Sequence, residues 1–234
     1  MTTQAEALIQ TEELQAVLEA RAFAYRMLAQ AFLAEPVRAQ IQSLAETGAV
    51  GIFPYADESA LIRQGMDEAQ AYLCDPANAT DEAFDALHWD YTRMFIGPDK
   101  LPAPPWESAY CNEERLLFQE QTVAVRRAFR DYGYANPGAP MEPDDHIGLE
   151  LDFLYRTCGL ALAAQQPADL VRICRDQLSF VKEHLQVWVP AFAADVARDA
   201  RTGFYRGMAR MLEGFVTIDR RLLEELLSEA QGDR

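Results

Sequence analysis

Helical periodicity runs through this chain from end to end, and it limits the possible folds more than any other feature of the sequence. Near the start, apolar residues recur on one helical face at Leu14, Leu18, Tyr25, Leu28 and Phe32. A half-buried strand would instead show strict alternation of apolar and polar residues. No such alternation and no fixed-period repeat is found, so the sequence predicts an all-α bundle of roughly nine or ten helices.

Single residues mark where several of these helices begin and end. Gly48 suits the C-terminal stop of a short helix, because glycine readily adopts the left-handed conformation found there. Thr80 is a favourable N-cap, and Pro167 suits the first turn of a helix. Another helix is expected after Pro190, since proline lacks the N–H that a helix interior needs.

Two proline-rich stretches interrupt the helical pattern and are predicted to be loops. Residues 97–106 hold four prolines in ten positions, and residues 133–143 hold two glycines and three prolines. Neither composition can continue a helix. We expect one helical domain over residues 1–234, in which a hinge at 133–143 joins an N-terminal lobe, 1–132, to a C-terminal lobe, 144–234.

The charge balance excludes one class of partner and favours another. The chain carries 21 basic and 37 acidic residues, a formal net charge of −16, so it would repel a nucleic acid. A basic partner is the better electrostatic match, although acidity also serves solubility. The first ten residues lack the charged region of a signal peptide, and no apolar stretch is long enough for a membrane span. We expect a cytoplasmic protein without stable membrane insertion.

An acidic cluster at the end of the predicted hinge is the first candidate site. It consists of Glu142, Pro143, Asp144, Asp145 and His146, and Glu150 lies one helical turn further on. Three interpretations stay open for this cluster. The aspartates can cap a helix, the carboxylates can bind an arginine of a ligand, or the set can bind a metal or perform acid–base chemistry.

The proline-rich loop that ends at Trp106 is the second candidate site. The segment continues to Tyr110, and Trp and Tyr beside prolines form a rigid amphipathic surface that suits peptide recognition. Trp106 can also plug the loop onto the core. Both roles are compatible if one edge of the ring is packed and the other faces a groove.

Other signals for catalysis or for a cofactor are absent from the sequence. It contains no glycine-rich phosphate loop, and its four cysteines form no Cys-x-x-Cys pair. A di-iron bundle needs Glu-x-x-His on two helices, and only Asp85 to His88 comes near that pattern. His88 is expected to be a half-buried helix residue and His184 a solvated one. We therefore expect neither enzyme activity nor a bound cofactor.

Three segments resemble the signature of the TorD/DmsD family, whose members are cytoplasmic chaperones of molybdenum oxidoreductases. The segments are Tyr91 to Pro98, Pro104 to Tyr110 and Glu142 to Gly148. The resemblance covers most of the chain and is specific between Tyr91 and Leu154. It implies the TorD-like helical fold, and it makes both a monomer and a domain-swapped dimer possible states of the protein.

The resemblance also implies a function and a binding site. Members bind the N-terminal twin-arginine leader of a molybdenum oxidoreductase catalytic subunit, and some also contact the body of the precursor. They delay Tat export until the cofactor is inserted and the enzyme is folded. A basic, partly apolar leader needs carboxylates and an aromatic groove, which the two candidate segments can supply. The residues implied or added as neighbours are Phe95, Gly97, Pro98, Trp106, Tyr110, Glu142, Asp144, Asp145 and His146.

Two alternatives to leader binding stay open. The first is an assembly chaperone of a molybdoenzyme that is not exported, such as a nitrate reductase subunit. The second is a helical metal-dependent enzyme that uses Asp144, Asp145, His146 and Glu150. For leader binding we expect a dissociation constant on the order of micromolar, which corresponds to about 8 kcal/mol.

Overall fold

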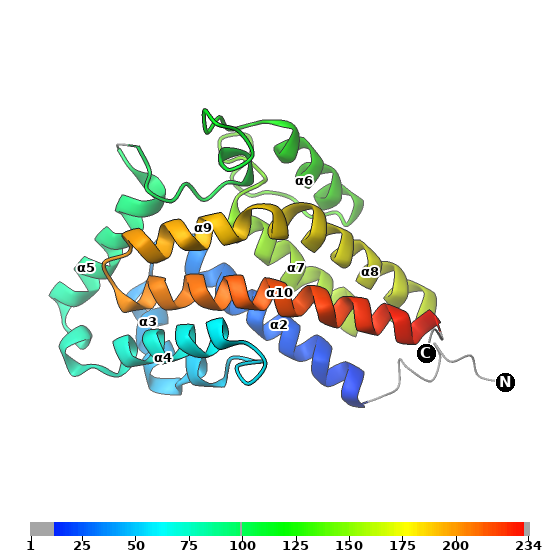
Figure 1. Ribbon diagram of the computed structural model, residues 1–234, viewed down its shortest axis with the longest axis horizontal. Coiled ribbons are helices and arrows are strands. Elements are labelled where there is room, and N and C mark those ends of the chain that lie inside the picture. The colour runs from blue at the N-terminus through cyan, green and yellow to red at the C-terminus, as the bar shows by residue number, and fades with distance from the viewer. Residues whose placement is uncertain (1–11, 99, 232–234) are drawn as a thin grey trace.

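The computed structural model describes residues 12–98 and 100–231, which fold into α-helices joined by turns and loops (Figure 1). Within this part of the chain the only β-type pairing is a single isolated bridge. The predicted all-α fold is therefore confirmed. Its α-helices are α2 (Glu12–Phe32), α3 (Arg38–Thr47), α4 (Ala60–Cys74), α5 (Asp81–Tyr91), α6 (Glu120–Asp131), α7 (Ile147–Leu162), α8 (Pro167–Phe180), α9 (Gln186–Asp199) and α10 (Gly203–Gln231).

Several helices begin or end at the residues that the sequence marks. The Thr80 hydroxyl caps α5 by accepting a hydrogen bond of 3.1 Å from the Ala83 N–H. Gly48 ends α3 with a φ of 62°, in the left-handed region that glycine adopts without steric cost. Pro167 stands in the first turn of α8, where its missing N–H would have no helical partner in any case. These three predictions are confirmed.

The helix count falls slightly below the prediction because α8 and α9 are not separated. A π-turn at Val181–Leu185 carries α8 directly into α9, and Pro190 lies inside α9 instead of ahead of it. A π-turn changes the local hydrogen-bond register, which allows the chain to adjust near a proline without ending the helix. Eight separate helical rods result within residues 12–98 and 100–231, where roughly nine or ten helices were predicted.

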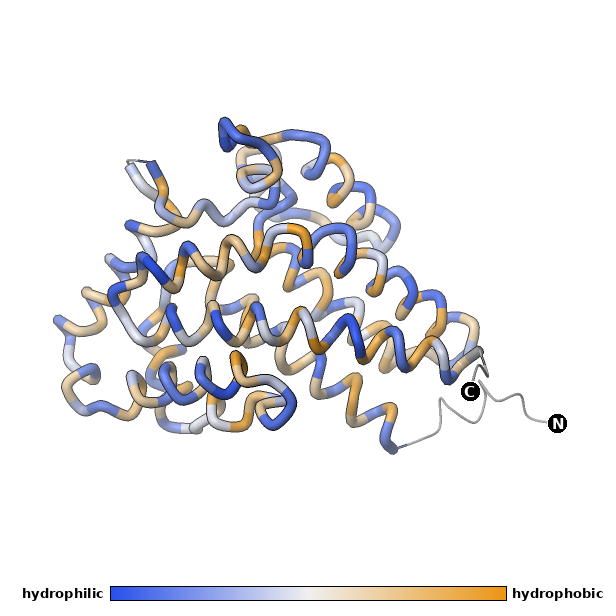
Figure 2. The backbone as a smooth tube through the Cα atoms, viewed as in Figure 1, coloured by the Kyte–Doolittle hydropathy of each residue, from blue (hydrophilic) through white to orange (hydrophobic). Residues whose placement is uncertain are grey.

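Helix α10 lies at the centre of the bundle. It packs along α4 on one side and against α9 on the other, while α2 packs along α7 (Figure 1). Gly65 and Gly207 allow α4 and α10 to approach closely, because a Cβ on Gly65 would lie 2.5 Å from the Gly207 carbonyl oxygen. Buried apolar residues of these helices form one core cluster. Apolar positions recur along each helix, as the orange parts of the backbone show (Figure 2).

This core crosses the boundary between the predicted lobes. Helix α4 precedes the predicted hinge and packs on α10, which follows it, and the same holds for α2 and α7. Residues 133–143 form a run of turns between α6 and α7. The two predicted lobes thus share one apolar core, and the division of the domain into these lobes stays a prediction.

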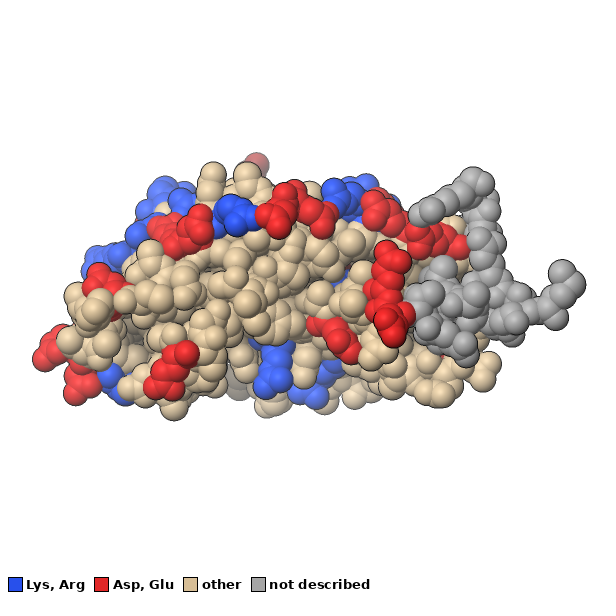
Figure 3. All heavy atoms as spheres, turned by 90° about the horizontal axis from the view of Figure 1, so that it is seen from below, with Lys and Arg blue, Asp and Glu red and all other residues tan. Residues whose placement is uncertain are grey.

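The surface at the bottom of the view in Figure 1 is not strongly acidic. Uncharged residues cover most of its middle, and acidic and basic residues stand mainly toward its edges (Figure 3). No helix among residues 12–98 and 100–231 combines the length and the apolar character that a bilayer span requires. The first ten residues, on which the expectation about a signal peptide rests, lie outside the described residues.

Candidate functional site

The two candidate segments of the sequence meet in the structure. Trp106, in the proline-rich loop, and His146, just before α7, form the isolated antiparallel bridge. Beside them, the Ile147 N–H donates a hydrogen bond of 2.8 Å to the Pro105 carbonyl. Backbone pairing therefore fixes the loop against the start of α7, although the two segments lie far apart in the sequence.

Asp145 holds this loop in place from its buried side through hydrogen bonds. Its side chain is fully buried, and one carboxylate oxygen accepts a hydrogen bond of 2.8 Å from the Ser108 N–H. The other oxygen accepts a hydrogen bond of 2.7 Å from the Thr122 hydroxyl of α6. The Asp145 carbonyl also accepts from the Glu107 N–H at 2.9 Å. Asp145 thus ties the loop, α6 and the start of α7 together, and both its carboxylate oxygens already have partners.

The neighbouring acidic residues are also engaged within the protein. Asp144 is buried, and its carboxylate accepts a hydrogen bond of 2.6 Å from Arg126 Nε of α6. Glu142 is half-buried and accepts a hydrogen bond of 2.5 Å from the indole N–H of Trp106. Burial raises the pKa of Glu142, while the hydrogen bond from Trp106 opposes that rise. The indole ring is therefore held in place while part of it stays accessible.

His146 is the N-cap of α7. Its Nδ1 accepts a hydrogen bond of 3.1 Å from the Gly148 N–H, which requires an unprotonated Nδ1. Burial lowers the pKa of His146 to about 4, so the imidazole is neutral near pH 7. Gly148 brings the first turn of α7 against α2, since any Cβ at this position would collide with the backbone of Leu33. The interpretation that the aspartates cap this helix is therefore wrong, because His146 is the cap and the carboxylates of Asp144 and Asp145 bond to other elements.

A second layer of polar residues lies beneath the loop. The sequence singled out Asp145 and Glu150 of this layer, but it did not single out Glu107 or show that these residues meet His184. Glu107 is buried, and its Oε2 lies 2.8 Å from His184 Nδ1. The prediction of a solvated His184 is wrong, because this histidine is buried within the π-turn that follows α8. Glu150 is fully buried and accepts a hydrogen bond of 3.4 Å from the Trp188 indole N–H. We call Glu107, Asp145, Glu150 and His184 the Glu107 cluster.

The Glu107 cluster holds more acidic groups than basic ones. Three carboxyl groups share the site with a single histidine, and Glu150 Oε1 has no hydrogen-bond partner among the described residues. Burial, together with the nearby charges of Glu107 and Asp145, raises the pKa of Glu150 well above its usual value. Repulsion between carboxylates therefore favours a protonated Glu150, and its hydrogen bond with Glu107 raises the pKa of Glu150 in the same direction.

Aromatic contacts connect Phe95 and Tyr110 through the core. Phe95 is buried, and its ring centroid lies 6.0 Å from that of Phe192. Phe192 in turn lies 6.3 Å from the half-buried ring of Tyr110. The Tyr110 hydroxyl donates a hydrogen bond of 3.1 Å to Asp195 of α9. Phe95 thus supports Tyr110 from the core through Phe192, and Tyr110 reaches the surface.

Gly97 and Pro98 line a hollow of about 380 Å³ at the end of α5. Its other walls include Trp89 and Pro102, and it carries basic residues such as Arg93 and Arg201. Neither Trp106 nor the acidic residues of the hinge motif line it. The predicted site residues therefore lie along the length of the proline-rich loop and do not surround one cavity.

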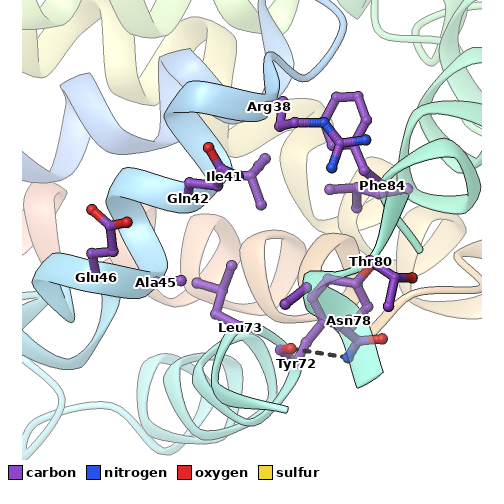
Figure 4. Close-up of a pocket in the computed structure, with 12 residues that line it drawn as sticks. Arg38, Ile41, Gln42, Ala45, Glu46, Tyr72, Leu73, Asn78, Thr80 and Phe84 are labelled. Atoms are coloured by element: carbon purple, nitrogen blue, oxygen red, sulfur yellow. Dashed lines mark hydrogen bonds between the residues drawn. The ribbon is translucent and has the colours of Figure 1, made fainter. Parts of the chain in front are cut away.

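Another hollow, of about 260 Å³, lies between α3, α4 and α5 (Figure 4). Ile41, Leu73 and Phe84 give it an apolar lining. The guanidinium of Arg38 lies 4.4 Å from the Phe84 ring centroid and forms an ion pair of 2.9 Å with Asp81. None of the predicted site residues lines this hollow, so it is separate from the candidate site.

The residues proposed for a metal-dependent enzyme do not converge on one point. Asp144 faces Arg126, Asp145 faces the loop, and His146 caps its own helix. No group of three or more His, Cys, Asp or Glu side chains suited to a metal ion is found in residues 12–98 and 100–231. His88 is half-buried, as predicted.

The nine predicted site residues thus fall into two groups. Five remain at least partly accessible, namely Gly97, Pro98, Trp106, Tyr110 and Glu142. Four are buried, namely Phe95, Asp144, Asp145 and His146. Helical spacing had already connected Glu150 with His146. The same spacing between His184 and Trp188 could have indicated that His184 faces the interior.

Comparisons with known proteins identify the family. The model of a family described as nitrate reductase delta subunit matches residues 59–194, more than half of the chain. The chaperone protein TorD of Vibrio cholerae is 29% identical over 177 residues, which cover 74% of this chain and 78% of the relative. A protein of Haemophilus influenzae that is named as a probable Tat proofreading chaperone DmsD is 31% identical over 119 residues, which cover 51% of this chain and 53% of the relative.

A solved structure is also similar. It is the crystal structure of a proposed redox enzyme maturation protein from Archaeoglobus fulgidus, with a TM-score of 0.45 and 21% sequence identity. The match covers 88% of this chain and 93% of that one. The family match, which includes both segments of the candidate site, and the named relatives agree with one another. This chain belongs to the nitrate reductase delta subunit family, the family of the TorD and DmsD chaperones.

Proposed function

We propose that this protein is a maturation chaperone for a molybdenum oxidoreductase and that it binds the twin-arginine leader of the catalytic subunit precursor. Binding delays Tat export until the cofactor is inserted and the enzyme is folded. Membership of the family and relatives named as chaperones support this proposal. The protein acts as a binding protein in the cytoplasm, where its client is made and where its four free cysteines would stay reduced.

The observation that carries the proposal is the pairing of the two signature segments. The bridge between Trp106 and His146 joins the proline-rich loop to the start of α7, and the hydrogen bond from the Ser108 N–H to the Asp145 carboxylate holds the loop there. The two segments thus form one surface. The hydrogen bond from Trp106 to Glu142 holds a half-exposed indole ring on that surface. A rigid aromatic ring with one free face suits an apolar segment of a peptide.

We propose that the predicted site residues act in two ways. Trp106, Tyr110 and Glu142, together with Gly97 and Pro98, contact the leader, since they remain accessible. The buried residues position this surface from beneath, because their polar atoms are engaged within the protein and their side chains are covered. These positioning residues are Phe95, Asp144, Asp145 and His146.

Calorimetric titration with a synthetic twin-arginine leader, taken from a molybdoenzyme encoded in the same genome, tests the function. We expect saturable binding with a dissociation constant on the order of micromolar. Trp106→Ala should weaken it about tenfold or more, because burial of an aromatic ring is lost. Ile52→Ala, which shortens another exposed apolar residue, should have no effect. No binding of any leader by the folded wild-type protein would refute the proposed function.

The family description favours a second client, a molybdoenzyme that is not exported, because the matching model is described as nitrate reductase delta subunit. This chaperone would bind an N-terminal segment that lacks the twin arginines. The same titration with such a segment distinguishes the two clients. Tight binding there, and weak binding of the twin-arginine leader, would support the second client.

A further inference from the structure

The loop between Tyr110 and α6 exposes apolar side chains to an unusual degree. Leu116 and Phe118 are each 53% exposed, and Val123, in the first turns of α6, is 54% exposed. Single exposed apolar residues are common, but here three lie within eight positions of the chain. We call residues 113–123 the acidic-apolar segment. It follows directly after the proline-rich loop, at the top of the view in Figure 1.

The backbone of this segment is held in an uncommon conformation. Arg115 and Phe118 have φ values of 54° and 59°, in the left-handed region that bulky side chains rarely adopt. The Asn112 side chain holds the turn closed by accepting from the Leu116 N–H at 2.8 Å and donating to the Leu116 carbonyl at 3.0 Å. A second bond from Asn112, to the Ser108 carbonyl at 2.6 Å, connects the turn to the Trp106 loop.

Acidic residues flank the apolar ones. Glu113, Glu114 and Glu120 are exposed, and none of them has an ion-pair partner among residues 12–98 and 100–231. Arg115 lies between them, but its guanidinium forms an ion pair of 3.2 Å with Asp195. The acidic-apolar segment therefore presents uncompensated negative charge.

Arg115 also joins this segment to the proposed leader surface. Its guanidinium lies 5.3 Å from the centroid of the Tyr110 ring, and Tyr110 donates a hydrogen bond to the same Asp195 carboxylate. The acidic-apolar segment is thus continuous with the surface around Trp106 and Tyr110. In contrast, Asp144 and Asp145 already have internal partners and offer little free charge to a ligand.

Positive charge begins further along α6. Arg127 and Arg130 are exposed and lie beyond Val123 in the direction of the chain. They would repel the arginines of a basic peptide. A ligand that has a basic part and an apolar part would therefore place its basic part near the loop and not near the end of α6.

We propose that the acidic-apolar segment is the docking site for the twin-arginine part of the leader, with Glu113, Glu114 and Glu120 facing the arginines and Leu116, Phe118 and Val123 contacting adjoining apolar residues. This inference rests on the proposed function and adds the residues that determine specificity for the arginines. Charge complementarity carries it, because a basic and partly apolar peptide meets unpaired carboxylates around an exposed apolar surface.

Two sets of variants test the proposal by titration of the full chain with the leader. Glu113→Gln with Glu114→Gln should weaken binding about fivefold, since exposed ion pairs contribute modestly. The matched control is Asp67→Asn with Asp85→Asn, which changes the net charge equally on α4 and α5, away from α6 (Figure 1). This control should bind the leader as wild type does.

The role of the apolar residues of the acidic-apolar segment is tested with Phe118→Gly. Glycine adopts the positive φ of 59° without strain, so the melting temperature should stay equal or rise. Leader affinity should nevertheless fall about tenfold, because the aromatic contact is lost. Val37→Gly removes a side chain that is 52% exposed at the start of α3, and it should leave affinity unchanged.

A second peptide, in which both arginines are replaced by glutamine, separates the two halves of the site. The loss from Glu113→Gln with Glu114→Gln should vanish with this peptide, whereas the loss from Phe118→Gly should persist. Wild-type binding of the leader together with unchanged affinity in both variants would overturn this inference and leave the proposed function intact. Failure of the wild type to bind any leader would overturn both.

Discussion

The Arg21 cluster, formed by Arg21, Tyr25, Gln177 and Asp219, and the Glu107 cluster are both buried, but they differ in charge balance. In the Arg21 cluster a single guanidinium meets a single carboxylate, at 2.5 Å from Nε to Oδ1. Tyr25 donates to the same carboxylate at 2.6 Å, and Arg21 donates to Gln177 at 2.8 Å. The cluster joins α2, α8 and α10 with its charges neutralised.

The Glu107 cluster lies beneath the candidate binding surface and is neither balanced nor fully paired. It brings three carboxyl groups to one histidine, and no donor within the described residues faces Glu150 Oε1, so an ionised Glu150 would leave this oxygen without a partner. Buried polar groups without partners are costly and are more often found where a protein acts than where it is only stabilised. The contrast indicates that the Arg21 cluster serves stability, whereas the Glu107 cluster shapes the loop at some cost in stability.

Asp219→Asn is expected to have the largest effect, because it leaves the Arg21 charge buried without a counter-charge. Breaking such a pair costs about 3–5 kcal/mol of unfolding free energy. Urea denaturation at neutral pH measures this loss. Asp81→Asn, which breaks a mostly exposed pair with Arg38, should cost less than about 1 kcal/mol. Equal losses in the two variants would remove the distinction between a buried and a surface pair.

Burial of His146 makes the stability of the candidate site depend on pH. Its folded-state pKa, about 4, lies below the value of 6.5 expected for an unfolded chain. The unfolded state therefore binds more protons between these values, and stability falls as the pH drops from 6.5 toward 4. The contribution of His146 to this loss is about 3 kcal/mol.

His146→Asn should remove this part of the pH dependence while keeping an N-cap for α7, since asparagine caps helices well. Unfolding free energies measured between pH 7 and pH 4 check this expectation. His88→Asn is the matched control, because His88 is more exposed and lies on α5. A wild-type slope in His146→Asn would show that another group is responsible.

The helices and several of their ends could be predicted from the sequence because local features determine them. Thr80 caps its own first turn, and Gly48 ends its own helix. The pairing of Trp106 with His146 could not be derived in this way, since backbone contacts between distant segments leave no local pattern. Similarity to a family supplied both segments without showing that they touch.

The burial of the acidic motif was not predictable for a related reason. Thr122 and Arg126 on α6, and Ser108 in the loop, are the partners of Asp145 and Asp144, and they lie far from the motif in sequence. His184 was predicted to be solvated because the charged residue Glu183 precedes it in the sequence. The π-turn places His184 inside the protein, and no propensity rule anticipates such a turn.

Asp145→Asn tests whether the Glu107 cluster, unlike the Arg21 cluster, supports leader binding. An amide cannot accept from both the Ser108 N–H and the Thr122 hydroxyl as a carboxylate does, so about 1–3 kcal/mol of stability is lost. Because Asp145 holds the loop, leader affinity should fall as well, whereas variants of the Arg21 cluster that remain folded keep it. A double-mutant cycle with Thr122→Val measures the coupling between the two side chains. A coupling of zero would show that the hydrogen bond between Asp145 and Thr122 does not hold the loop in place.

Glu150→Gln is expected to have the smallest effect and the opposite sign. The folded-state pKa of Glu150 is raised, because burial and the charges of Glu107 and Asp145 oppose its ionisation. The folded state therefore binds more protons than the unfolded state above the ordinary pKa of 4.5, and wild-type stability falls as the pH rises through this range.

Glutamine at position 150 is neutral at every pH, so this loss should disappear. The variant should be more stable than the wild type at pH 7 by on the order of 1 kcal/mol and about equally stable near pH 4. Glu46→Gln, at an exposed position on α3, controls for the change in net charge. If Glu150→Gln instead lowers stability at pH 7, the carboxyl group of Glu150 stabilises the fold, and the proposed contrast between the two clusters fails. A gain in stability with reduced leader affinity would show that the unbalanced charge is retained because binding requires it.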